Sequence, residues 1–165
     1  MAKYDIPIDT IPDCFHLIGE LATRWGWIEN QTGVIIRELL HLKKPEGHMA
    51  IGNMGIQPKT RVIASLAQHL FKTNKLGAEI SDLADAIQEF DKFRNDVIHG
   101  LWVYYPKGTK ELALLRRKNL QQQVDPHPDK DAVKQLAPKI AKLREIQNEA
   151  QRITRAIKAL RGKFE

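Results

Sequence analysis

The chain has 165 residues, of which 42% are hydrophobic and 28% are charged, and its formal net charge is +6. This is the ordinary composition of a soluble globular protein with a core of its own, and no apolar run approaches the ~20 residues needed to cross a bilayer. A single cysteine, Cys14, excludes an internal disulfide. Because the start of the sequence has no apolar signal region, we expect a cytoplasmic protein that does not contact membranes.

A first long helix is predicted to begin near Ile11-Pro12-Asp13 and to end at Lys43-Lys44-Pro45. Its apolar residues recur at spacings of three and four: Phe15, Ile18, Leu21, Ala22, Trp25, Ile28, Ile35, Ile36, Leu39 and Leu42. Glycines weaken a helix, so the three that lie seven residues apart at 19, 26 and 33 indicate close packing against a neighbour.

Residues 45–57 are predicted to form a loop. Its Gly52 and Gly55, with Lys59 just beyond, suggest a phosphate-cradling loop, but Pro58 precedes Lys59 and no apolar strand leads in, so the pattern fails. A second helix is predicted from Pro58 to about Lys72, and its buried residues should be Val62, Ile63, Leu66, Leu70 and Phe71.

The next helix is predicted over Ile80–Leu101, capped by Ser81 or by acidic residues near its start. Arg94 falls in the middle of its apolar stripe, which consists of Ile80, Leu83, Ala84, Ile87, Phe90, Val97, Ile98 and Leu101. Beside the stripe, Asp91, Asn95 and His99 follow one another at intervals of four. A guanidinium that faces a core or an interface is costly unless a partner or ligand meets it. Arg94 is therefore a candidate functional residue.

Residues 101–118 are predicted to form a short β-hairpin or an extended flap, because two apolar, aromatic or β-branched runs flank the turn residues Pro106 to Thr109. Four of its residues could bind RNA by base stacking and charge, although packing of the flap is the alternative for the tyrosines: Tyr104, Tyr105, Lys107 and Lys110. Residues 121–129 are a linker.

The last helix is predicted over about 130–162, and Pro138 should kink it or mark its true start. Residues 131–165 hold nine Lys or Arg against four Asp or Glu, so most of the excess positive charge lies here. Such a helix can attract a phosphate backbone, or it can simply present a solvated face. The whole chain, residues 1–165, is thus predicted to be one all-α domain, a four-helix bundle with a short hairpin.

Arg94, Asn95 and His99 also carry a family resemblance. Arg-Asn, three residues and then His, late in a helix of a helical chain, resembles the Arg-x4-6-His motif of the HEPN superfamily. The resemblance implies a HEPN-like bundle, a site made by Arg94, Asn95 and His99, and a dimer in which two motifs face each other. Many members are metal-independent ribonucleases of toxin, antiphage and RNA-processing systems, and some bind without cutting.

The chemistry of RNA cleavage without a metal suits these side chains. A base must take the proton of the 2′-hydroxyl, an acid must protonate the leaving 5′-oxygen, and a cation must meet the charge on the phosphate. His99 is assigned as general acid or base, because an imidazole titrates near working pH. Arg94 is assigned as the phosphate-binding residue. Asn95 would orient the ring or the ribose, and Asp91 could hold the guanidinium.

Two considerations qualify this site. Residues five apart differ in direction by about 140° on a helix, so Arg94 and His99 would form a cleft more easily across a two-fold dimer interface. The structural alternative is that Arg94 pairs with a buried carboxylate such as Glu29 or Asp91, while His99 caps the helix end. A glycine after a helix suits the left-handed conformation, so the helix is also expected to fray at Gly100.

The hypothesis is a metal-independent endoribonuclease that needs no cofactor, with RNA, a second copy of the chain and an antitoxin protein as partners, in a toxin–antitoxin or phage-defence setting. The alternative is a non-catalytic HEPN-like module that binds a protein or nucleic acid. A zinc site is not indicated, because the histidines lack paired spacing, and Cys14 is interpreted as a small core residue.

Overall fold

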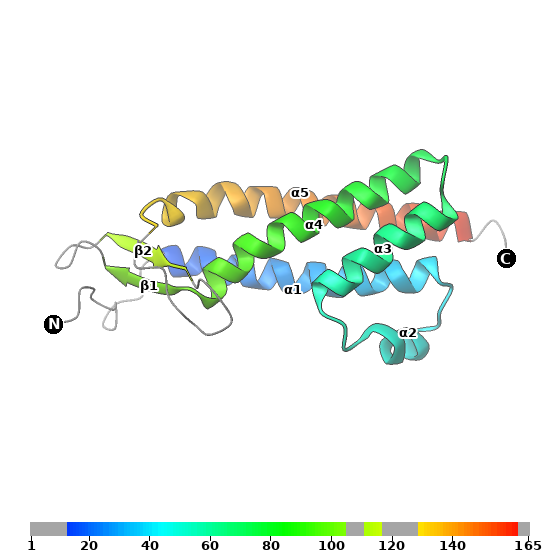
Figure 1. Ribbon diagram of the computed structural model, residues 1–165, viewed down its shortest axis with the longest axis horizontal. Coiled ribbons are helices and arrows are strands. Elements are labelled where there is room, and N and C mark those ends of the chain that lie inside the picture. The colour runs from blue at the N-terminus through cyan, green and yellow to red at the C-terminus, as the bar shows by residue number, and fades with distance from the viewer. Residues whose placement is uncertain (1–12, 105–110, 117–128, 162–165) are drawn as a thin grey trace. The chain divides into compact units, whose positions relative to one another are not determined.

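The computed structural model describes residues 13–104, 111–116 and 129–161. These residues form an all-helical fold with one small antiparallel sheet (Figure 1). The described elements are, in chain order, α1 (Cys14–Leu39), α2 (Lys44–Ile51), α3 (Ile56–Leu70), α4 (Lys75–His99), β1 (Leu101–Tyr104), β2 (Leu112–Leu115) and α5 (Ala132–Arg161).

The chain divides into two compact units, and each of the three long helices contributes to both. One unit comprises residues 24–91 and 143–165, and the other comprises residues 1–23 and 92–142. In the first unit, the Trp25 indole is 1% exposed and stacks on Phe90 with ring centroids 5.8 Å apart. Around it lie fully buried aliphatic residues from α1, α3, α4 and α5, namely Ile28, Ile35, Ile36, Ile63, Ile80, Ile87 and Ile153.

The second unit has its own core, centred on the hairpin. Trp102 of β1 meets Phe15 edge-on at a centroid distance of 6.4 Å. The buried aliphatic residues of this unit come from every described element that it contains, namely Leu21, Val97, Val103, Leu114, Leu136 and Ile140. Burial of large apolar side chains is the main stabilising contribution in each unit.

The hairpin prediction is confirmed. Leu101 pairs with Leu115 and Tyr104 with Leu112 in an antiparallel register, and a further isolated bridge joins Leu114 to Asp129 through two backbone hydrogen bonds. Of the linker predicted at 121–129, only Asp129 is among the described residues.

The loop predicted at residues 45–57 is wrong in its first half, because α2 occupies Lys44–Ile51. The element is only eight residues long, so its helical periodicity is too short to detect. Its start is fixed locally: Pro45 occupies the first turn, and the backbone N–H of Lys43 donates to Glu46 Oε2 at 2.9 Å. The fold therefore has five helices among its described residues where four were predicted.

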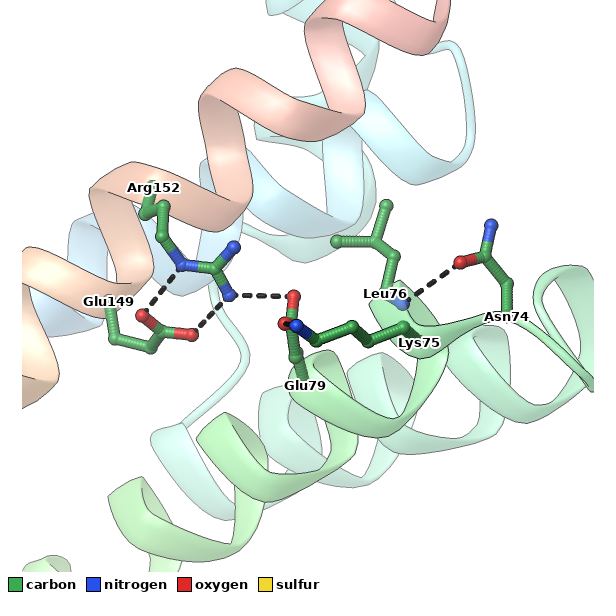
Figure 2. A network of polar contacts seen from close by, with 6 residues as sticks. All are labelled: Asn74, Lys75, Leu76, Glu79, Glu149 and Arg152. Atoms are coloured by element: carbon green, nitrogen blue, oxygen red, sulfur yellow. Dashed lines mark hydrogen bonds and ion pairs between the residues drawn. The ribbon is translucent and has the colours of Figure 1, made fainter.

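The start of α4 and the exposure of one residue in α3 also differ from the prediction. α4 begins at Lys75, five residues early, because the side-chain oxygen of Asn74 accepts a hydrogen bond from the Leu76 N–H at 3.1 Å (Figure 2). Asn is a strong N-capping residue, and a Cβ at Gly77 in the first turn would come within 2.6 Å of the Phe71 carbonyl oxygen. In α3, Ile63 is fully buried as predicted, whereas Leu70 near its end is 47% exposed.

Pro138 lies inside α5, six residues after its start, so it does not mark the beginning of the helix. The predicted close packing of glycines in α1 is wrong at Gly19 and Gly26, where an added Cβ would meet no described atom within 4 Å. At Gly33 the Cβ would contact the Ile51 side chain at 3.8 Å. None of the helices among the described residues has the length and apolarity needed to span a bilayer.

Candidate functional site

The end of α4 carries the three motif residues. Arg94 is half-buried, and its Nη1 donates a hydrogen bond to Asn95 Oδ1 at 2.6 Å. His99 is the last residue of the helix and is exposed. The structure thus joins Arg94 to Asn95 directly, through a short hydrogen bond between side chains that are adjacent in sequence. Asn95 was assigned to the imidazole or the ribose, but its oxygen is turned to the guanidinium.

The predicted supporting residue Asp91 is 3% exposed and belongs to the unit of residues 24–91 and 143–165, whereas Arg94 belongs to the other unit. Its Oδ2 accepts a hydrogen bond from Gln57 Nε2 at 3.3 Å. Glu29, the other carboxylate considered for Arg94, accepts a hydrogen bond from the Trp25 indole at 2.8 Å. Both carboxylates thus take part in hydrogen bonds within residues 24–91.

An ion cluster next to the motif was missed by the sequence reasoning. Arg116, the residue after β2, places Nη1 2.9 Å from Asp96 Oδ2 and Nη2 2.6 Å from Asp129 Oδ2. The hydrogen bond to Asp129, followed by the nearby Asp96 charge, raises the pKa of Arg116. Arg116 therefore ties the motif helix to the hairpin and to the residues before α5.

Only tertiary structure brings these three charges together. Asp96 and Arg116 are 20 residues apart, and Asp129 follows at a further 13. In the sequence each one looks like an ordinary exposed charge. The one available signal is that Asp96 lies inside the motif, between Asn95 and His99.

The hairpin also fixes the end of α4. The Trp102 indole N–H donates to the Val97 carbonyl at 3.1 Å, and the Gly100 N–H donates to the Asp96 carbonyl at 2.9 Å. Terminal carbonyls of a helix need such partners. A Cβ at Gly100 would collide with the Asp96 carbonyl oxygen and the Leu114 side chain. Gly100 is thus needed for close approach to β2, and the predicted left-handed conformation is not adopted.

The basic C-terminal helix is partly neutralised by local contacts. Lys134 Nζ lies 3.0 Å from Asp131, and Arg152 contacts both Glu149 and Glu79 at 2.6 Å (Figure 2). Lys139 of α5 also lies near the motif: its Nζ is 5.3 Å from the centroid of the ring of Phe93, the α4 residue directly before Arg94.

The proposed RNA contacts of the hairpin are only partly described. Tyr104 ends β1 and is half-buried. Tyr105, Lys107 and Lys110 lie outside the described residues. Base stacking by this segment stays a prediction.

Cys14 is a buried core residue, as predicted, at 6% exposure, and burial raises the pKa of its thiol. Within the described part of the chain, no three His, Cys, Asp or Glu side chains are grouped so as to hold a metal ion. No family model, curated protein or solved structure matches this sequence.

Proposed function

We propose that this chain is a HEPN-like domain and a metal-independent endoribonuclease, with Arg94, Asn95 and His99 as its catalytic residues. The observation that carries the proposal is the short hydrogen bond from Arg94 to Asn95 beside the exposed His99 at the end of α4. The amide oxygen of Asn95 is uncharged, and its hydrogen bond from Nη1 orients the Arg94 guanidinium. An oriented, half-buried guanidinium suits a phosphate.

The reaction is an internal transesterification. An imidazole takes the proton of the 2′-hydroxyl, the 2′-oxygen forms a bond to phosphorus, and the bond from phosphorus to the 5′-oxygen breaks. A proton is delivered to the departing 5′-oxygen, which leaves a 2′,3′-cyclic phosphate and a 5′-hydroxyl. Arg94 meets the charge that develops on the non-bridging oxygens.

Two copies of the motif serve this reaction better than one. Arg94 and His99 point about 140° apart on an ideal helix, and the reaction needs both a base and an acid. A two-fold dimer through α4 would supply two imidazoles and two guanidinium groups to one cleft. RNA is then the substrate, and a toxin–antitoxin or phage-defence setting, with an antitoxin protein as inhibitor, is the corresponding biological role.

The motif clamp, formed by Arg116, Asp96 and Asp129, joins the motif helix to the end of β2. Because Asp96 is paired with Arg116 at 2.9 Å, the one acidic residue inside the motif has a cation of its own. Among the described residues, the ion pairs of Arg116 are with Asp96 and Asp129, so its proposed role is to position the turn of α4 that carries Asn95 and His99.

The test is cleavage of single-stranded RNA by the purified chain in EDTA. We expect cleavage by the wild type, products ending in 2′,3′-cyclic phosphate, and loss of at least about 100-fold in rate for Arg94→Ala and His99→Ala. Lys92→Ala is the matched control, because Lys92 is an exposed cation two residues before Arg94. Circular dichroism confirms that each variant is folded. Equal cleavage by His99→Ala and the wild type would refute the assignment.

A non-catalytic HEPN-like interaction module is the second candidate. The observation in its favour is that no hydrogen bond among the described residues orients the imidazole of His99, whereas catalytic histidines are usually oriented by a partner. This candidate predicts RNA or protein binding without cleavage. It also predicts that overexpressing the wild type and His99→Ala affects growth equally, whereas a ribonuclease predicts toxicity of the wild type alone.

A further inference from the structure

A cavity of about 310 Å³ lies among α1, α2 and α3, remote in sequence from the motif and wholly within residues 24–91. Three of its lining residues are cations and one is an acid, and aliphatic side chains form another part of the wall. The wall includes the charged residues Arg37, Lys44, Lys59 and Glu29 and the aliphatic residues Val34 and Ile51. With its four charged side chains the cavity has a net charge of about +2.

Specific local packing forms the wall between α1 and α2. Gly47 is buried, and a Cβ there would come within 2.9 Å of Arg37 Cγ and 3.0 Å of its Cδ. The absence of a side chain at Gly47 therefore lets the aliphatic stem of Arg37 lie against α2. One turn earlier in α1, a Cβ at Gly33 would lie 3.8 Å from Ile51 Cδ1, an ordinary contact distance, so this position does not require glycine. The contact between Gly47 and the Arg37 stem therefore brings α2 close to α1 at this wall.

The charges that line the cavity are only partly compensated. Arg37 Nη2 lies 3.1 Å from Glu38, which is outside the lining. The Lys59 ammonium group lies 3.5 Å from the backbone oxygen of Glu29. Among the described residues, neither Lys44 nor Lys59 forms an ion pair with a carboxylate. The cavity thus brings together the ammonium groups of Lys44 and Lys59, which form no ion pair within the described part of the chain, and the guanidinium of Arg37.

We propose that this cavity binds a small phosphate monoester, independently of the proposed ribonuclease site. Lys44 and Lys59 contact the phosphate oxygens, and Arg37 completes the charge complement. The organic part of the ligand lies over Val34 and Ile51. The volume is at the lower end of the range for small-molecule sites, which suits an ester about the size of a sugar phosphate or a mononucleotide.

Part of this site is visible in the sequence as a glycine- and lysine-containing segment. Gly52 and Lys59, which both line the cavity, belong to the segment that resembles a phosphate-cradling loop. That pattern requires a loop between a strand and a helix, whereas here α2 and the first turns of α3 supply the residues. The cations therefore act through their side chains, without the backbone N–H cradle of a glycine-rich loop.

The test is calorimetric titration of the full chain with ribose 5-phosphate, AMP and adenosine in phosphate-free buffer. We expect saturable binding of at least one of the two esters, with a Kd of about 1 mM or tighter, and none of adenosine. The double variant Lys44→Met/Lys59→Met should weaken ester binding at least about tenfold. Lys158→Met, which removes one exposed cation of α5, should bind as the wild type does.

Three results would overturn the proposal: no saturable binding of either ester, equal binding of adenosine, or undiminished binding by a folded double variant. Both lysines reach solvent, so the double variant is expected to keep the helical circular dichroism spectrum of the wild type. If it unfolds, the single variants Lys44→Gln and Lys59→Gln replace it, and ester binding that neither variant weakens contradicts the site. RNA cleavage plays no part in these measurements.

Discussion

Arg116→Gln removes the cation that joins the motif helix to the hairpin. In the folded chain, Arg116 forms ion pairs at 2.9 Å with Asp96 and at 2.6 Å with Asp129. Glutamine keeps a polar side chain of moderate length but loses the charge and the forked donor geometry. The variant leaves two carboxylates close together without their cation.

The expected loss of stability follows from how exposed the three side chains are. The Arg116 side chain is 39% exposed, and those of Asp96 and Asp129 are 20% and 22% exposed. Solvent screens pairs of this kind, so each contributes about 0.5–1 kcal/mol. Losing both should lower the free energy of unfolding by about 1–2 kcal/mol, and the melting temperature of a chain of this size by about 4 °C.

Urea unfolding of the wild type, Arg116→Gln, Asp129→Asn and the double variant measures this prediction. The double-mutant cycle isolates the Arg116–Asp129 pair, for which we expect a coupling energy of about 0.5–1 kcal/mol. High salt should reduce the difference between wild type and Arg116→Gln. Additive single effects would refute the claim that the Arg116–Asp129 pair stabilises the fold, and an Arg116→Gln variant as stable as the wild type would refute the claim that this cluster holds the hairpin on the motif helix.

Two further predictions concern a glycine contact and an ion pair. Gly100→Ala should destabilise the chain by about 1–3 kcal/mol, because its Cβ would collide with Leu114. Gly26→Ala should instead stabilise α1 by about 1 kcal/mol, because a Cβ at Gly26 meets no atom within 4 Å. Thermal unfolding of both variants measures the two changes, and changes of the same sign would contradict this prediction. The hydrogen bond from Arg152 lowers the pKa of Glu149 below its usual 4.5, so this pair stabilises the folded chain above that pH and the contribution is lost as the pH falls through the lowered pKa. The stability difference between wild type and Arg152→Gln should therefore be constant near pH 7 and shrink below about pH 4, and a difference that does not change with pH would show that the pair contributes nothing.

The sequence by itself determined those elements whose signal is local. The spacing of apolar residues at three and four predicts α1, α3, α4 and α5, because one face of each helix must be buried. Trp25, Ile63 and Ile87 are accordingly in the core. The alternation from helix to β-branched and aromatic residues after His99 likewise predicts the hairpin. The same periodicity predicts that Arg94, Asn95 and His99 lie late in a long helix, and they do lie at the end of α4.

Tertiary structure alone decided the features that depend on residues far apart in the chain. Helix α2 is too short for its periodicity to be recognised, and it is defined by Pro45, Glu46 and its packing on Arg37. No local sequence pattern pairs Asp96 with Arg116, because the two residues are 20 apart and meet only when the hairpin packs on α4. Periodicity determines which face of an element is buried, whereas long-range packing determines which charges meet, and both the motif clamp and the basic cavity belong to the second kind.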